Sequence, residues 1–187
     1  MEYTFKQRAE KIVLFCLNSK STNPIKLFGE ITAKDFVRMH GPEHHIIDGA
    51  CLLTAFYNTG GKIDLKQSLL ILVKEAERMP GAICGLWGVC GAATSIGAAL
   101  AVIDGTGPLS SDGSWGKHMV LCGDILKNIG ATKGPRCCKR DGVIALLTAV
   151  EYISTNFDIQ LDKGNFACSF SGINSQCIAD RCPFRKG

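Results

Sequence analysis

Apolar residues recur at helical spacing along most of this chain, and Gly or Pro separates one such segment from the next. The clearest segment is 65–79, which follows Asp64, a residue type that caps helix starts, and stops at Pro80-Gly81. Six further helices are predicted at 5–18, 33–39, 42–57, 92–103, 114–128 and 139–154. Strand-like alternation is weak and is limited to a short pair near 159–161 and 166–168. The pattern therefore predicts a mainly α protein.

The predicted helices form a single compact helical domain of about seven helices with an irregular, Cys-containing C-terminal tail. Its parts are N-terminal helices at 1–39, a helical core with the Cys and His motifs at 40–156, and a Cys-rich tail at 157–187. Thr32 is expected to cap the helix at 33–39. Only 7% of the residues are aromatic and 21 residues are Gly, which favours close helix packing over a β-sandwich.

Composition and charge exclude several classes of partner. The net charge of +4 is mild, and the nearest approach to a basic patch is too short to predict nucleic-acid binding: Lys133, Arg136, Lys139 and Arg140. The N-terminus has no signal-peptide core, and the most apolar stretch, 88–103, is shorter than a membrane span. We therefore expect a cytoplasmic protein without a membrane partner, which acts on a small-molecule substrate or with a redox partner protein.

The ten cysteines are expected to be free thiols or metal ligands, because nothing marks the chain as secreted. The tail carries the strongest signal. Cys177 and Cys182 are separated by four residues, Pro183 follows, and Cys168 lies upstream. An irregular segment of this kind can direct several sulfurs to one point, although the spacing is neither that of a ferredoxin nor that of a zinc finger.

Cysteines also stand just before two predicted helices. Cys90 precedes the helix at 92–103, and the pair Cys137-Cys138 precedes the helix at 139–154. The free N–H groups and the positive dipole end at a helix start favour a thiolate, and Arg136, Lys139 and Arg140 add positive charge beside the pair. Only one of the two adjacent cysteines is expected to be a ligand. The alternative is apolar filling of the core, which we expect for Cys16, Cys51 and Cys122.

Three of the four histidines lie within six residues, in His40-Gly-Pro-Glu43-His44-His45. On a helix that starts at Pro42, the side chains of His44, Asp48 and Cys51 share one face. Glu43 or His44 could then donate or accept a proton, and a histidine could bind a metal. The alternative is a capped helix start with solvated histidines, one of which is held in place by the aspartate.

Four segments together resemble an uncharacterised prokaryotic domain family. They are His40-Gly-Pro-Glu-His-His, Gly-Val-Cys90-Gly-Ala-Ala, Gly-Pro-Arg-Cys137-Cys138-Lys-Arg and Cys177-Ile-Ala-Asp-Arg-Cys182-Pro-Phe. The family occurs alone or attached to methyltransferase-type or radical-SAM modules in anaerobic bacteria and archaea. The resemblance covers about 40–184 and carries no established activity. It implies that these segments are the family's signature, and its anaerobic setting favours iron–sulfur chemistry.

The leading hypothesis is an iron–sulfur protein, an enzyme of redox or sulfur-transfer type with a 4Fe–4S cluster. Its expected ligands are Cys90, one of Cys137 and Cys138, Cys177 and Cys182, with His44, His45 and Glu43 as proton-transfer neighbours. One alternative is a binding module in which the same cysteines hold a structural zinc ion. Another is a metal-free thiol–disulfide protein that uses Cys84 with Cys90 or Cys177 with Cys182, although no Cys-x-x-Cys motif is present.

Overall fold

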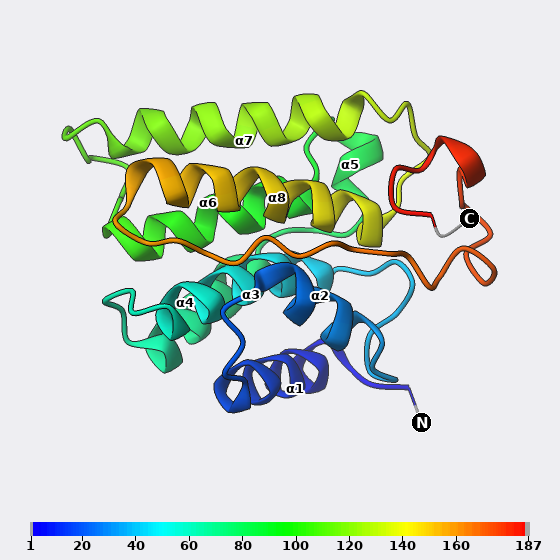
Figure 1. The fold of residues 1–187 in the computed structure, drawn as a ribbon, viewed down its shortest axis with the longest axis horizontal. Coiled ribbons are helices and arrows are strands. Elements are labelled where there is room, and N and C mark those ends of the chain that lie inside the picture. The colour runs from blue at the N-terminus through cyan, green and yellow to red at the C-terminus, as the bar shows by residue number, and fades with distance from the viewer. Residues whose placement is uncertain (1, 186–187) are drawn as a thin grey trace.

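The computed structural model describes residues 2–185 and confirms a single, all-helical domain in them (Figure 1). The described chain contains eight α-helices and one short 3₁₀-helix, η1. Their bounds are α1 Phe5–Asn18, α2 Pro24–Thr32, α3 His44–Asn58, α4 Leu65–Glu77, α5 Ile83–Leu86, α6 Gly91–Asp104, α7 Ser114–Gly130, α8 Cys138–Asn156 and η1 Ala179–Arg181. None of these helices is long and apolar enough to cross a membrane.

Helix α3 forms the centre of the domain, because every residue from His44 to Phe56 is buried. It packs against α1, α2, α4, α6 and α8. α3 approaches α6 closely at Gly49, whose backbone N–H donates to Ser95 Oγ at 2.9 Å. A Cβ atom at Gly49 would lie 2.6 Å from the Ser95 carbonyl oxygen, so only glycine permits this approach. The buried start of α3 is thereby fixed against α6.

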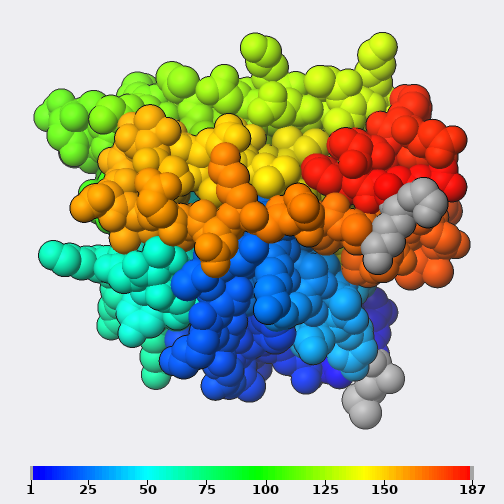
Figure 2. Space-filling view, in the orientation of Figure 1, coloured from blue at the N-terminus to red at the C-terminus, as the bar shows by residue number. Residues whose placement is uncertain are grey.

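The tail after α8 runs across the surface between α8 and the N-terminal helices, and Figure 2 shows it as the orange-to-red band. Aromatic contacts attach it to the helices. The Phe157 ring lies 5.8 Å from the Phe56 ring of α3, and the Phe166 ring lies 6.1 Å from the Phe28 ring of α2. Within the tail, the Phe166 ring lies 5.9 Å from the Phe184 ring. The tail is irregular as predicted, and it is held along its length by a few side chains.

The capping residues decide where the correctly predicted helices begin. Thr4 and Gln7 form a reciprocal capping box at the start of α1, and Asp64 accepts a hydrogen bond from the Gln67 backbone N–H at the start of α4. These two helices lie within two residues of the predicted bounds. α6, α7 and α8 were also predicted, and each extends one or two residues further at one end or at both.

The helix predicted at 33–39 is wrong, because the helix in this region is α2, nine residues earlier. Asn23 caps α2 by accepting from the Lys26 N–H, and Pro24 takes the first helical position, where its missing N–H costs nothing. Thr32 is the last residue of α2 and donates its hydroxyl hydrogen to the Phe28 carbonyl oxygen. Residues 33–43 form turns and bends that lead into α3.

Two further predictions on secondary structure need correction. No helix is predicted in the segment 81–91, because it contains four glycines, but the structure has the short helix α5 there. The strand pair expected near 159–161 and 166–168 does not form in the described chain. Cys168 instead makes an isolated parallel bridge with Arg185, and its backbone N–H donates to the Phe184 carbonyl oxygen at 2.7 Å.

Candidate functional site

The starts of α3, α6 and α8 meet around a cavity of about 240 Å³. We call it the large cavity to distinguish it from a much smaller cysteine-lined cavity. The segment 81–84, which leads into α5, closes one side of the large cavity. Ionisable side chains make up most of its wall: Arg38, His40, His44, His45, Asp48, Cys84, Cys90, Arg136, Cys138 and Asp141. The histidine segment and two of the helix-start cysteines that the sequence singled out therefore do converge on one site.

Two cysteines lie in the large cavity because two helices begin there. Cys90 is the N-cap residue of α6 and Cys138 is the first residue of α8, and no side chain caps either helix. Burial raises the pKa of the Cys138 thiol to about 12, and the Gly41 N–H group opposes the rise. Burial also raises the pKa of Cys90, which the Ala92 N–H group opposes. Burial outweighs these N–H groups, so both side chains are thiols at neutral pH.

Glu43 is buried beside the large cavity and does not line it. Arg38 holds its carboxylate with a 2.7 Å ion pair and a 2.9 Å hydrogen bond from the backbone N–H, and Arg8 lies 4.0 Å away. Burial alone would raise the pKa of Glu43, but the hydrogen bonds from Arg38 outweigh it and lower the pKa to about 2. The arrangement makes Glu43 an ionised anchor for the loop before α3.

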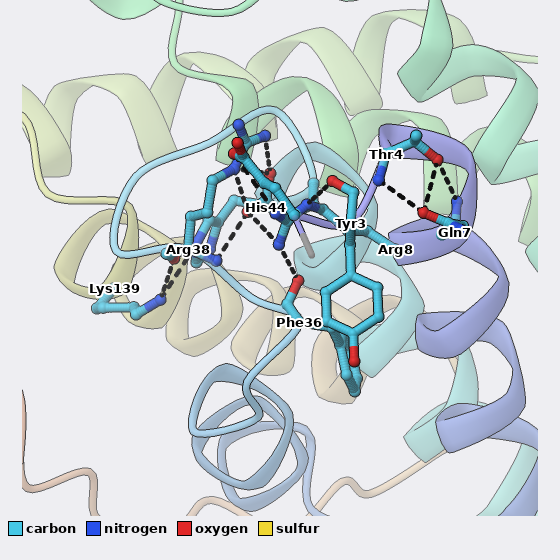
Figure 3. A network of polar contacts seen from close by, with 10 residues as sticks. Tyr3, Thr4, Gln7, Arg8, Phe36, Arg38, His44 and Lys139 are labelled. Atoms are coloured by element: carbon cyan, nitrogen blue, oxygen red, sulfur yellow. Dashed lines mark hydrogen bonds and ion pairs between the residues drawn. The ribbon is translucent and has the colours of Figure 1, made fainter.

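His44 lines the large cavity and takes part in a buried polar network (Figure 3). Its Nε2 atom lies 3.1 Å from Lys139 Nζ, which also donates to the Arg38 carbonyl oxygen at 2.8 Å. Burial and the charge of Lys139 lower the pKa of His44 to about 3, and burial lowers the pKa of Lys139 to about 8. His44 is therefore neutral at physiological pH, and its Nε2 atom is already occupied.

The other two histidines also have fixed surroundings. Burial lowers the pKa of His45, and a hydrogen bond to the Met79 carbonyl opposes the shift. His40 Nε2 lies 3.1 Å from Asn174 Oδ1, and the same oxygen accepts from the Gln176 N–H at 3.0 Å. Because this oxygen can only accept, His40 carries its proton on Nε2 and Nδ1 keeps a lone pair.

The sequence placed Asp48 on the helix face of His44 and offered it only the role of holding a histidine. Asp48 lies one helical turn after His44, is 1% exposed, and has no hydrogen bond or ion pair within residues 2–185. Burial and the neighbouring Asp141 raise its pKa well above the ordinary value, which favours the protonated acid in the wall of the cavity. The only sequence signal for it was its place on the helix face of His44.

Asp141 has a different role from Asp48, although both line the large cavity. Its carboxylate accepts from the Cys137 N–H at 3.3 Å and from Arg140 Nε at 3.0 Å. It therefore stabilises the start of α8. Burial still raises its pKa, against the lowering by Arg140.

The predicted thiolate set is divided between two cavities. Cys90 and Cys138 line the large cavity together with Cys84, whereas Cys177 and Cys182 line a second one of about 20 Å³, the small cavity, together with Cys137 and Cys168. The idea that one site gathers all these cysteines is corrected accordingly. Among residues 2–185, no three His, Cys, Asp or Glu side chains stand in position to hold a single metal ion.

The cysteines expected to fill the core mostly do so. Cys16 and Cys51 are fully buried, and burial raises the pKa of both thiols. Cys122 is half-buried on α7, and its thiol donates to the Ala93 carbonyl oxygen at 3.4 Å. These three residues line neither cavity.

One family model matches residues 12–185, which is nearly the whole chain and includes the lining of both cavities. The chain belongs to the family of unknown function DUF5714. This membership confirms the resemblance to an uncharacterised domain family. No curated protein and no solved structure matches the chain.

Proposed function

We propose that this protein is an iron–sulfur enzyme of redox or sulfur-transfer type, with the cluster in the large cavity. The proposed ligands are Cys84, Cys90 and Cys138. The observation that carries the proposal is that three thiols from separate segments line one cavity of about 240 Å³, which they share with the buried acid Asp48. A 4Fe–4S cluster with three cysteine ligands would leave one iron for a small-molecule substrate.

The electrostatics of the large cavity suit an anionic cluster. Cys90 and Cys138 stand at the starts of α6 and α8, where the helix dipoles place positive charge. The Ala92 and Gly41 N–H groups already oppose the rise in pKa of the two thiols. Arg136 lines the same cavity and has no ion pair among the described residues, so its charge is available to a bound anion. Hydrogen bonds and nearby cations of this kind stabilise thiolate-bound clusters.

Asp48 is the residue we assign to proton transfer in this site. Burial raises the pKa of this carboxyl group in the cavity wall and favours its protonated form, whereas Glu43 is ionised and bound by Arg38. His44 and His45 line the cavity in their neutral forms, each with one ring nitrogen bonded to the backbone. They would shape the site and orient a substrate, and Asp48 would supply a proton to it.

Anaerobic reconstitution with ferrous iron and sulfide tests this proposal. We expect a brown protein with about four iron and four sulfide per chain, and loss of most of both in Cys90→Ser. Cys122→Ser is the matched control, because Cys122 is a partly buried cysteine at the side of α7 and lines neither cavity. A wild-type chain that stays colourless would refute the proposal, and so would equal iron contents in the two variants.

A further inference from the structure

We propose that Cys137, Cys168, Cys177 and Cys182 bind one zinc ion, which fastens the tail to the start of α8. This centre is separate from the proposed cluster and does not depend on it. The four cysteines come from three parts of the chain and line the small cavity together. Its volume of about 20 Å³ is close to that needed for one water molecule, so it has room for an ion and none for a substrate.

Backbone N–H groups are directed at the sulfurs in the tail. The Phe170 N–H donates to Cys168 Sγ at 3.4 Å, and the Ala179 N–H donates to Cys177 Sγ at 3.4 Å. In each case the donor lies two residues after the cysteine, so two unrelated parts of the tail repeat one local geometry. Hydrogen bonds of this kind favour the thiolate over the thiol, and outer donors of this type orient metal ligands.

The sulfur of Cys137 also has N–H donors beside it. The Arg140 and Lys139 backbone N–H groups at the start of α8 are directed at the Cys137 sulfur. Asn174 Nδ2 lies 3.5 Å from the same sulfur. Three of the four sulfurs therefore face N–H donors, which a set of neutral core cysteines would not require.

The backbone of the tail is strained where it forms this geometry. Ala179 has a φ of 50°, in the left-handed region that residues with a Cβ atom rarely adopt. The strained residue lies between Cys177 and Cys182, so it sets the path of the chain from one cysteine to the other. Strain of this kind persists only where other interactions compensate for it, and a bound ion would supply that compensation.

Two buried cations, Lys139 and Arg140, follow Cys137 at the start of α8. Lys139 is 1% exposed, and no carboxylate in residues 2–185 lies within hydrogen-bonding distance of its ammonium group. Arg140 is 3% exposed and lines the small cavity directly. A zinc ion with four thiolates carries a net charge of −2, so it would provide the counter-charge that Lys139 lacks.

A closed four-cysteine site is the usual coordination of structural zinc, with Zn–S distances of about 2.3 Å. The four sulfurs border the small cavity without converging on one point, so binding would draw them inward. Three of them belong to the irregular tail, which can follow the metal without disturbing the helices. The zinc ion would also fix Asn174, which holds His40 of the large cavity through its other side-chain atom.

The test is metal analysis of the full-length protein with a variant pair. We expect one zinc per chain in the wild type and in Cys122→Ser, and an affinity at least about 100-fold lower in Cys177→Ser, because one of four thiolate ligands is lost. Equal zinc contents in Cys177→Ser and Cys122→Ser would overturn the proposal. Iron in place of zinc at these cysteines would overturn the choice of metal.

Cobalt substitution of the wild-type protein gives a result that does not depend on the folding of a variant. Cobalt bound by four thiolates has intense thiolate-to-metal absorption, and one equivalent should produce it and be displaced by zinc. Cobalt spectra that show no thiolate ligation would contradict the assignment. The iron content of the large cavity is measured separately, so failure of either centre can be recognised without the other.

Discussion

Cys137 and Cys138 are consecutive residues whose side chains line two different cavities. Cys137 is the extended N-cap residue of α8, and its sulfur meets the tail. Cys138 is the first helical residue, and its sulfur lies with the starts of α3 and α6. The change of backbone conformation between them turns the two side chains apart, so both can be ligands without sharing a metal.

The close approach of α8 to α3 gives the first prediction. A Cβ atom at Gly142 would lie 2.5 Å from Asp48 Oδ1 and 2.7 Å from the Phe28 ring. Gly142→Ala should therefore lower the free energy of unfolding by about 1–3 kcal/mol. Gly123→Ala is the control within α7, where a Cβ atom meets nothing within 4 Å. It should raise stability by about 0.5–1 kcal/mol. Urea unfolding measures both, and equal stabilities would contradict this packing.

Glu43 should make stability depend on acidic pH. Its pKa is held at about 2 in the folded protein by Arg38, below the value of 4.5 in an unfolded chain. The stabilisation is therefore complete at neutral pH and is lost as the pH falls from about 4.5 towards 2. Glu43→Gln should cost about 2 kcal/mol at pH 7, and the difference from wild type should shrink near pH 3. A difference that stays constant with pH would show that Arg38 does not hold an ionised Glu43.

Asp48 should make the stability of the protein depend on pH in the opposite direction. Its folded pKa is raised by burial and by Asp141, so the folded state retains a proton that the unfolded chain has lost. Wild-type stability should fall as the pH rises above the ordinary aspartate value, whereas Asp48→Asn removes this loss. In metal-free protein at pH 8, Asp48→Asn should be more stable than wild type by at least about 1 kcal/mol. Parallel pH profiles from urea unfolding would mean that Asp48 is ionised in the folded state.

The fold was predictable wherever a helix shows both its apolar period and its capping residue. α4 has Asp64 before it and Leu69 and Leu72 within it, and the prediction was right to within two residues. α2 is short, and the helix predicted in this region begins at residue 33, nine residues after Pro24, which starts α2. The central position of α3 could not be predicted, because it depends on the approach of Ser95 to Gly49 across 46 residues.

The sequence was enough to predict which residue types form the site, but not which cysteines share a cavity. Cysteines at helix starts and histidines before α3 were identified from spacing, and the large cavity contains both kinds. Glu43 was expected to transfer protons because the sequence does not show that Arg38 binds it. The partition of the cysteines depends on the directions of the Cys137 and Cys138 side chains and on the path of the tail, which spacing does not encode.

The most direct test of two separate centres replaces Cys137 in one variant and the adjacent Cys138 in another. Cys138→Ser and Cys137→Ser should be reconstituted anaerobically in parallel, and their iron, sulfide and zinc contents measured. Cys138→Ser should lose iron and sulfide and keep its zinc, because Cys138 lines the large cavity. Cys137→Ser should lose zinc and keep its iron and sulfide, because Cys137 lines the small one. Loss of the same metal from both variants would contradict the account.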